Sequence, residues 1–274
     1  MRLPSLAPFG ILASPRTADA IGFFLDSRRA KGLSSETLNV YGYRLNAFAR
    51  AFKHLPANPR EIEGFLGSGH WSASTRETYF RLLRNLYRWL ERREHIRRSP
   101  MPHVEAPHVP HKVAKGLSPG ELDRLLTHPG HNSGVRALLY LLADTGLRLG
   151  EAFSVTSRSV RARTVLVNGK AGEREVPISR DVRGIVLANG PWTWSSSQAA
   201  GLAVRRAFKR AAISGPRAGA HALRHTFVRQ WKGDESVLIG IMGWTSSRML
   251  KVYRPYDLER AIEQHRAYSP ISES

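Results

Sequence analysis

The chain has 274 residues, and its 42 Lys and Arg residues against 22 Asp and Glu residues give a formal net charge of +20. Apolar residues make up 42% of the chain and the mean hydropathy is −0.33, a balance that excludes a wholly disordered or collagen-like protein. No apolar run reaches the roughly 18 residues of a membrane span, and the absence of cysteine excludes a disulfide scaffold, a thiol nucleophile and cysteine-ligated zinc. We therefore expect a cytoplasmic protein that does not enter a membrane.

The large positive charge predicts a polyanionic partner, and nucleic acid is the commonest such partner. Arginine accounts for 34 of the 42 cationic residues, and its planar guanidinium can grip a phosphate with two hydrogen bonds. Codon bias in a GC-rich genome is an alternative explanation for the excess of arginine over lysine. It does not explain the total charge, so we expect the chain to bind nucleic acid.

The first hundred residues carry the apolar spacing of helices. From Ser34 onward, apolar residues recur at steps of three and four, which predicts one helix with an apolar stripe: Leu38, Tyr41, Leu45, Phe48 and Phe52. Asn58–Glu61 has the pattern of a capping box with proline at the first helical position, so a short helix is expected to begin there.

A second capping box, Ser74–Glu77, predicts the start of a longer helix whose apolar face runs from Tyr79 to Leu90. Arginines flank that face and acids are few, so we expect the helix to face DNA; the alternative is an ordinary solvated surface. The candidate DNA-binding residues on it are Arg76, Arg81, Arg84 and Arg88.

Residues 99–116 contain four prolines and three histidines without hydrophobic periodicity, which is typical of an extended linker. We expect an N-terminal extension at 1–14, a helical domain at 15–100 and a linker at 101–116. His103, His108 and His111 lack acidic partners and lie in this loop, so a solvated linker is favoured over a metal site.

The second half begins with another capping box, Ser118–Glu121. The apolar run Val135–Ala143 predicts a buried helix that ends near Gly146. Two β-rich runs, 164–167 and 173–178, flank a glycine-containing turn and predict a hairpin, after which helical patterning returns. The fold class is therefore mainly α, with two domains and one small antiparallel sheet.

Three cationic residues in this half lie in contexts that suit phosphate chemistry. Arg148 lies in TGLRLGE at a break between two helices, and Arg224 lies in HALRH with His221 one turn earlier on the same face. Lys170 lies at the tip of the predicted hairpin, in the turn between its two strands. Each signal alone has an ordinary alternative: a surface cation or a structural histidine.

Two further residues complete a pattern: Trp244, and Tyr253 nine residues after it. The ordered set Arg148, Lys170, His221, Arg224, Trp244 and Tyr253 resembles the signature of the tyrosine site-specific recombinases, the phage-integrase family. The matching stretches are TGLRLGE, VNGKAGEREVPI, HALRH and the spacing from MGW to Tyr253. The resemblance implies a catalytic domain of the tyrosine recombinase and type IB topoisomerase fold at 117–256. More loosely, residues 15–100 resemble the family's SAM-like four-helix core-binding module.

The resemblance also implies phosphoryl transfer that needs neither a metal nor another cofactor. Arg148 and Arg224 would clamp the scissile phosphate, and Lys170 would protonate the leaving 5′ oxygen. Tyr253 would be the nucleophile, and His221 would donate a hydrogen bond or take up the nucleophile's proton. The sequence contains no phosphate-binding loop and no carboxylate cluster for two-metal catalysis.

Several neighbouring residues have secondary expectations. Trp244 stands where the family most often has histidine; its indole can donate to a phosphate oxygen and buttress the tyrosine, but it cannot act as an acid or base. Glu151 is expected to orient the arginines, with an exposed helix acid as the alternative. His225 is expected to be structural, and Tyr256 is the rival nucleophile.

The expected partner is double-stranded DNA at a specific site, bound by a homotetramer on two duplexes, with a monomer in solution left open. DNA integration, the resolution of chromosome or plasmid dimers, and the transposition of a mobile genetic element are not separable here. The tail, 257–274, would dock on a neighbouring protomer or pack on its own. The alternatives are a non-catalytic DNA-binding protein and a type IB-like topoisomerase; an RNA-binding module lacks any matching signature.

Overall fold

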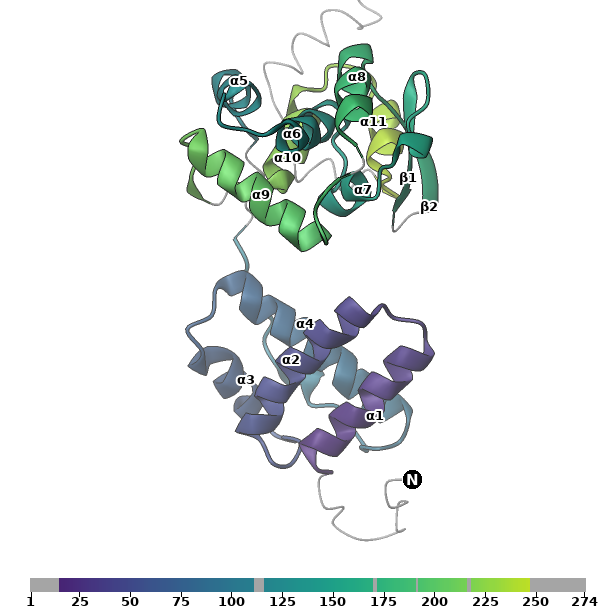
Figure 1. Ribbon diagram of the computed structural model, residues 1–274. Helices are drawn as coiled ribbons and strands as arrows, with labels where there is room; N and C mark the ends of the chain where they lie inside the picture. The colour runs from purple at the N-terminus through teal and green to yellow at the C-terminus, as the bar shows by residue number, and fades with distance from the viewer. Residues whose placement is uncertain (1–14, 111–115, 170–171, 191, 216–217, 247–274) are drawn as a thin grey trace, which may run out of the picture. The chain divides into compact units, whose positions relative to one another are not determined.

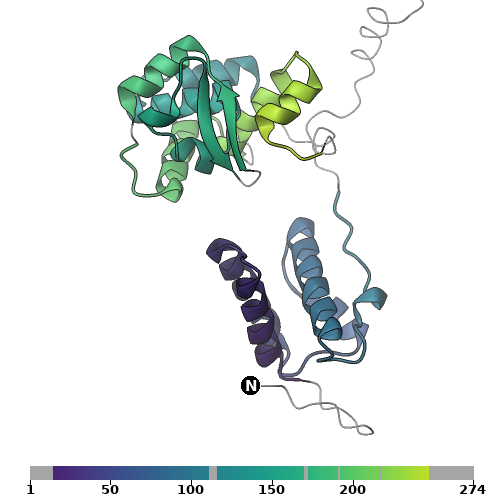
Figure 2. The same cartoon turned by 90° about the vertical axis from the view of Figure 1, so that its right-hand side faces the viewer.

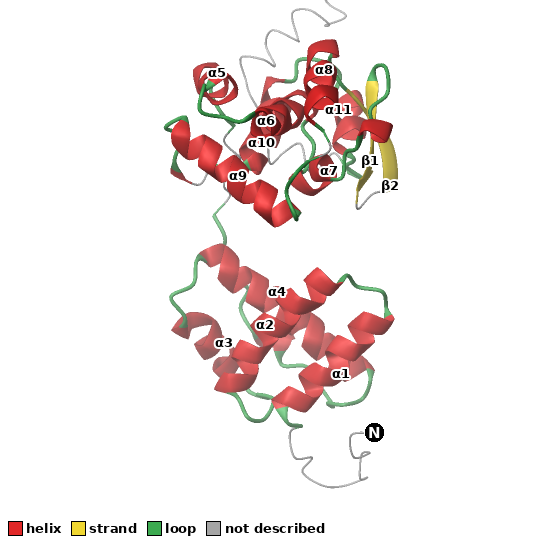
Figure 3. Ribbon diagram, in the orientation of Figure 1, coloured by secondary structure: helices red, strands yellow, loops and turns green. Residues whose placement is uncertain are grey.

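The computed structural model describes residues 15–110, 116–169, 172–190, 192–215 and 218–246. The chain divides into two compact units, Met1–His111 and Lys112–Ser274 (Figure 1). Among the described residues the first unit is built from helices alone, and the strands belong to the second unit (Figure 3). No helix in these described ranges is both long and apolar enough to cross a membrane. The mainly α fold with one small sheet is as predicted.

The first unit packs its helices around an aromatic core. Its elements are α1 (Thr17–Ala30), α2 (Ser35–Ala51), α3 (Pro59–Ser68), α4 (Ala73–Arg92) and the 3₁₀ helix η1 (Met101–His103). The stripe predicted on α2 lies against this core, where Leu45 and Phe48 are fully buried. The phenol of Tyr87 in α4 donates a hydrogen bond to the carbonyl of Pro56, 2.8 Å away.

The start of α3 is as predicted and the start of α4 is not. Pro59 is the first residue of α3, and the side chain of Asn58 accepts a hydrogen bond from the Arg60 N–H. The N-cap of α4 is Ser72 rather than Ser74, because the Ser72 hydroxyl accepts the Thr75 N–H at 3.2 Å. An equally good capping side chain two residues upstream therefore lengthens the helix.

The stretch predicted to be a linker begins inside the first unit. Met101 and Val104 are buried in its core, and the Ser99 N–H donates to the Glu91 carboxylate. The Glu105 N–H donates in the same way to Glu63. The two apolar side chains fill space against α4, and prolines are compatible with the 3₁₀ turn that carries them. Residues 101–105 are thus part of the first unit, contrary to the prediction.

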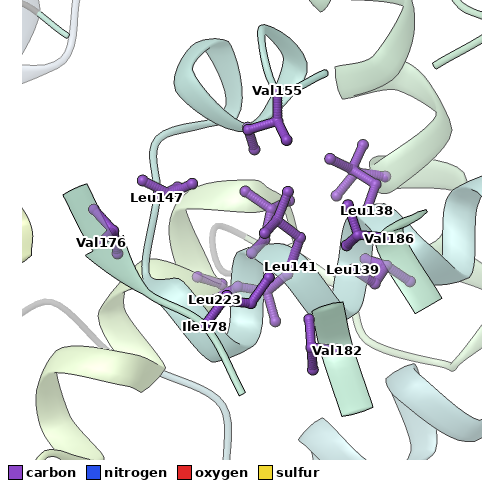
Figure 4. Packing of buried hydrophobic residues seen from close by; sticks show 14 of the residues in the cluster. Leu138, Leu139, Leu141, Leu147, Val155, Val176, Ile178, Val182, Val186 and Leu223 are labelled. Carbon is purple, nitrogen blue, oxygen red and sulfur yellow. The ribbon is translucent and has the colours of Figure 1, made fainter. Parts of the chain in front are cut away.

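The second unit surrounds one central helix. Its elements are α5 (Pro119–Thr127), α6 (Ser133–Thr145), α7 (Leu149–Phe153), η2 (Ser157–Ser159), β1 (Thr164–Gly169), β2 (Gly172–Pro177), α8 (Arg180–Asn189), α9 (Ser197–Arg210), α10 (Ala220–Gln230) and α11 (Glu235–Met242). Ser118 and Glu121 form the predicted capping box of α5. Helix α6 contacts α8 and α10, and its leucines fill the core together with side chains from those helices and from β2 (Figure 4).

The hairpin is as predicted, with strands that extend closer to the turn. The antiparallel register runs from Thr164 opposite Pro177 to Gly169 opposite Gly172. Val165, Val167 and Val176 point into the core and are buried. The paired strands lie beside α11, which contacts β2 (Figure 2).

The turn from α6 into the segment that carries Arg148 depends on glycine. Gly146 caps α6 with φ of +62°, and a Cβ there would lie 2.6 Å from Met242 Cε and 2.7 Å from Phe227 Cδ1. Left-handed backbone is costly for other residues, and the neighbouring side chains leave no space. Gly146 therefore fixes how the chain enters α7.

We predict that Gly146→Ala lowers the free energy of unfolding by about 1–3 kcal/mol, through backbone strain and overpacking. The matched control is Gly184→Ala, because Gly184 is an exposed residue within α8 whose added Cβ would meet nothing within 4 Å. That change should raise stability by roughly 0.5–1 kcal/mol. Urea unfolding of both variants measures the difference, and equal stabilities would contradict the role given to Gly146.

Candidate active site

The structure describes four of the six residues singled out from the sequence. Arg148 precedes α7, His221 and Arg224 lie one turn apart on α10, and Trp244 follows α11. Lys170 and Tyr253 lie outside the described residues, as does the rival Tyr256. The described part of the candidate site therefore consists of the two arginines, the histidine, the tryptophan and the groups that contact them.

Arg224 is almost fully buried and joins the ends of two helices. Its side chain is 2% exposed; one guanidinium nitrogen donates to the Gly146 carbonyl at 2.7 Å and another to the Met242 carbonyl at 2.9 Å. These carbonyls lie at the C-terminal ends of α6 and α11, where a positive charge is favourable. Its guanidinium carbon also lies 5.6 Å from the ring centroid of Trp244, which is itself buried.

Glu151 is a buried carboxylate that binds two arginines. It accepts hydrogen bonds from the Arg148 backbone N–H at 2.9 Å and from the Arg148 guanidinium at 3.1 Å. It also receives two bonds from Arg174, one on each oxygen, both at 3.1 Å. Glu151 is therefore not an exposed helix acid, and the side chains it holds are Arg148 and Arg174.

The electrostatics of Glu151 follow from these contacts. Burial by itself raises the pKa of the Glu151 carboxyl, but the hydrogen bonds and positive charges of Arg174 and Arg148 outweigh burial and hold the pKa below its ordinary value. The carboxylate is therefore ionised at neutral pH. A buried charge of this kind needs paired and hydrogen-bonded surroundings, and the two arginines provide them.

Arg174 was not singled out from the sequence. Besides its two bonds to Glu151, its Nε donates to the Ile241 carbonyl at 3.1 Å, at the C-terminal end of α11. The alternation of side chains along a strand could have identified it, because residues two apart lie on the same face. Arg174 lies two residues before the buried Val176 and shares its face of β2, whereas Glu173 and Glu175 are exposed. An arginine on the inward face requires a buried acceptor.

His221 lies within electrostatic reach of both candidate arginines. Partial burial lowers the pKa of His221, and the positive charges of Arg224 and then Arg148 lower it further. The pKa of His225, one turn further along α10, is lowered to about 4 by burial and by the charges of His221 and Arg224. Both imidazoles are therefore neutral at pH 7, and only a neutral imidazole can accept a proton.

The candidate DNA-binding arginines of the first unit are all exposed on α4. The Arg81 guanidinium lies 3.7 Å from Glu77, and that of Arg84 lies 5.6 Å from the ring centroid of Phe80. Their contact with DNA stays a prediction. In the part of the chain that the structure describes, no group of three or more His, Asp and Glu residues could hold a metal ion.

Comparison with known proteins gives relatives in sequence and in structure. No model of a known protein family matches the chain. Over 278 residues it is 24% identical to tyrosine recombinase XerD of Yersinia pestis, covering 88% of this chain and 93% of that protein. Over 174 residues it is 32% identical to tyrosine recombinase XerD of Shewanella oneidensis, covering 58% of each.

The fold has counterparts among solved structures. One of them is a lambda integrase tetramer bound to a Holliday junction, which matches with a TM-score of 0.72 at 17% identity and covers 89% of this chain and 80% of that one. The fold is therefore that of an integrase. The chain is therefore similar in sequence, over both units, to tyrosine recombinases, and it shares the fold of an integrase.

Proposed function

We propose that this chain is a tyrosine site-specific recombinase, which cuts and rejoins double-stranded DNA at a specific site through a 3′-phosphotyrosyl intermediate on Tyr253, without a metal or ATP. The observation that carries the proposal is the hydrogen bond from Arg224 to the Gly146 carbonyl, which brings α10, with His221 and Arg224, to the segment two residues before Arg148. Phosphoryl transfer develops negative charge on the phosphate oxygens, and fixed cations offset that charge.

Arg148 is the cation best suited to contact the phosphate. Its side chain is 37% exposed, and Glu151 orients its guanidinium from the buried side. Arg224 adds a second permanent charge from its buried position. Through the Gly146 carbonyl, Arg224 also holds the backbone two residues before Arg148.

The bond changes balance without a cofactor. The Tyr253 oxygen attacks phosphorus, the P–O5′ bond breaks, and the phenol proton passes to His221 while Lys170 gives a proton to the leaving 5′ oxygen. Attack of a 5′ hydroxyl on the phosphotyrosine reverses these changes and rejoins DNA. A neutral His221 suits the role of proton acceptor. The buried Trp244 would hold Arg224 in place through the contact between its ring and the guanidinium.

We further propose that four copies act together on two duplexes. The support is the similarity of fold to the lambda integrase tetramer on a Holliday junction. The arginines exposed on α4 and the net charge of +20 suit extended contact with the phosphate backbone.

The proposed mechanism predicts a covalent intermediate between Tyr253 and DNA. Purified chain is incubated with nicked chromosomal fragments of its source organism, quenched with SDS, and the DNA that stays linked to protein is sequenced and then resynthesised as a nicked duplex. We expect an adduct on the 3′ phosphate that forms in EDTA and is absent from Tyr253→Phe.

Tyr256→Phe is the matched control and should form the adduct normally. An adduct that survives Tyr253→Phe but is lost in Tyr256→Phe would move the nucleophile to Tyr256. If neither variant nor the parent forms an adduct on DNA that the parent binds, the chain is a non-catalytic DNA-binding protein.

The proposed mechanism also predicts the effect of removing the Arg148 guanidinium. Arg148→Ala should slow adduct formation by about 10²–10³-fold, the cost of removing one donor to a developing negative charge. The fold should persist, because Glu151 keeps both hydrogen bonds to Arg174. Arg224→Ala is a poorer test, because it leaves two buried helix-end carbonyls without a donor.

Arg136→Ala is the control for the loss of one positive charge, since Arg136 is exposed on α6. We expect it to change DNA affinity only slightly and the rate of adduct formation not at all. Single-turnover rates at saturating DNA measure both variants, and equal rates would contradict the role of Arg148.

The rate of cleavage should also depend on pH, through His221. Burial and the charges of Arg224 and Arg148 lower the pKa of His221 from 6.5 in the chain without DNA, so most of the imidazole is neutral at pH 6.5 and it gains its proton at lower pH. Protonation of His221 removes the proton acceptor, so the rate of adduct formation should fall as the pH falls. At subsaturating DNA the pH profile reports the enzyme without substrate, and its midpoint should lie below 6.5. The same acid limb in His221→Gln would contradict this assignment.

A further inference from the structure

We propose that Arg174 is a positioning residue for strand cleavage, acting through Glu151 to hold Arg148 where the scissile phosphate binds. This inference rests on the proposed function. It assigns a role to a residue outside the six that the family resemblance selects, and it derives from the hydrogen bonds and the packing around one guanidinium.

The Arg174 guanidinium joins three elements at once. Two of its nitrogens bind the two oxygens of Glu151 in α7, and its Nε binds the Ile241 carbonyl at the end of α11, while its own backbone belongs to β2. The side chain is 14% exposed, so these bonds form largely away from water. A planar fork of this kind fixes the direction of the carboxylate as well as its distance.

Two glycines leave the space that this ion pair fills. A Cβ on Gly169 would collide with Glu151 Oε1, and a Cβ on Gly243 would lie 3.0 Å from the guanidinium carbon of Arg174. Gly243 also has φ of +60°, so the α11 terminus needs glycine for its backbone too. The backbone on both sides is therefore shaped around Arg174 and Glu151.

The contacts return to the segment that carries Arg148. Arg174 binds the Ile241 carbonyl, Arg224 binds the next carbonyl, that of Met242, and Arg224 also binds Gly146, two residues before Arg148. Arg148 is thus held by its side chain through Glu151 and by its backbone through Gly146. A shift of β2 or of the end of α11 would reach Arg148 by either route.

A purely structural role is the competing explanation, because any buried glutamate needs a counter-charge. The two explanations differ in what they predict for the reaction. A structural role lowers stability and affects all activities alike. A positioning role slows cleavage through Arg148 while DNA affinity is retained, and its effect disappears once Arg148 has been removed.

The test uses Arg174→Lys, which keeps the charge but lacks the fork that binds both oxygens of Glu151 and the Ile241 carbonyl. On the nicked duplex recovered with the parent chain, we expect single-turnover adduct formation to slow by roughly 10- to 100-fold, since a misplacement of about 1 Å can cost a factor of 10². DNA affinity should stay within about threefold, because many cations contact the backbone.

The decisive measurement is a double-mutant cycle with Arg148→Ala. If Arg174 acts through Arg148, Arg174→Lys adds almost no further slowing in the Arg148→Ala background. Val176→Ala is the matched control, since Val176 is buried on the same face of β2 and its side chain has no group that could form a hydrogen bond to either arginine. It should lower the melting temperature and leave the rate unchanged below that temperature.

Each outcome either supports the positioning role of Arg174 or overturns it. A parent chain that forms no adduct overturns the proposed function, and this inference with it. A parent that cleaves, with Arg174→Lys as fast as Val176→Ala or with effects that add to those of Arg148→Ala, overturns the positioning role alone. Should Arg174→Lys not fold by circular dichroism, Glu151→Gln replaces it in the cycle, and slowing that adds to that of Arg148→Ala again overturns the role.

Discussion

The buried carboxylate of Glu151 is the constraint on which the site depends. Taking this charge out of water is costly, and the four hydrogen bonds from Arg148 and Arg174 offset the cost. Because Glu151 lies in α7 and Arg174 lies in β2, these hydrogen bonds fix the position of the hairpin relative to the short helix. The ionised state of Glu151 in turn keeps Arg148 pointing in one direction, so the same contact serves stability and geometry.

The arginines of this unit divide their tasks by burial. Arg224 is enclosed and binds helix-end carbonyls, Arg174 is mostly enclosed and binds Glu151 and α11, and Arg148 keeps more than a third of its side chain exposed. An enclosed guanidinium gives up its donors to the protein, whereas an exposed one can still donate to a ligand. Arg174 and Arg224 therefore fix the position of the segment that carries Arg148.

Prediction from the sequence succeeded where the cause is local. The hairpin, the buried α6 with its glycine cap and the capping box of α5 all depend on residues within one turn or one strand pair. The errors at Ser72 and at Met101 arose from competition: two serines suit the start of α4, and a proline-rich stretch contains two apolar residues that α4 can cover. Only packing decides between such alternatives.

What the sequence by itself determined is the class of chain and the identity of the candidate chemistry, because charge, hydrophobic period and ordered motifs need no knowledge of contacts. It also placed Arg148, His221, Arg224 and Trp244 as candidates. The tertiary structure alone decided that Arg224 is buried, that Glu151 binds Arg174 and that the end of α11 is held by two arginines. These facts depend on groups distant in the chain meeting where water is excluded, and the energy of a charge there is set by its neighbours in space rather than in sequence.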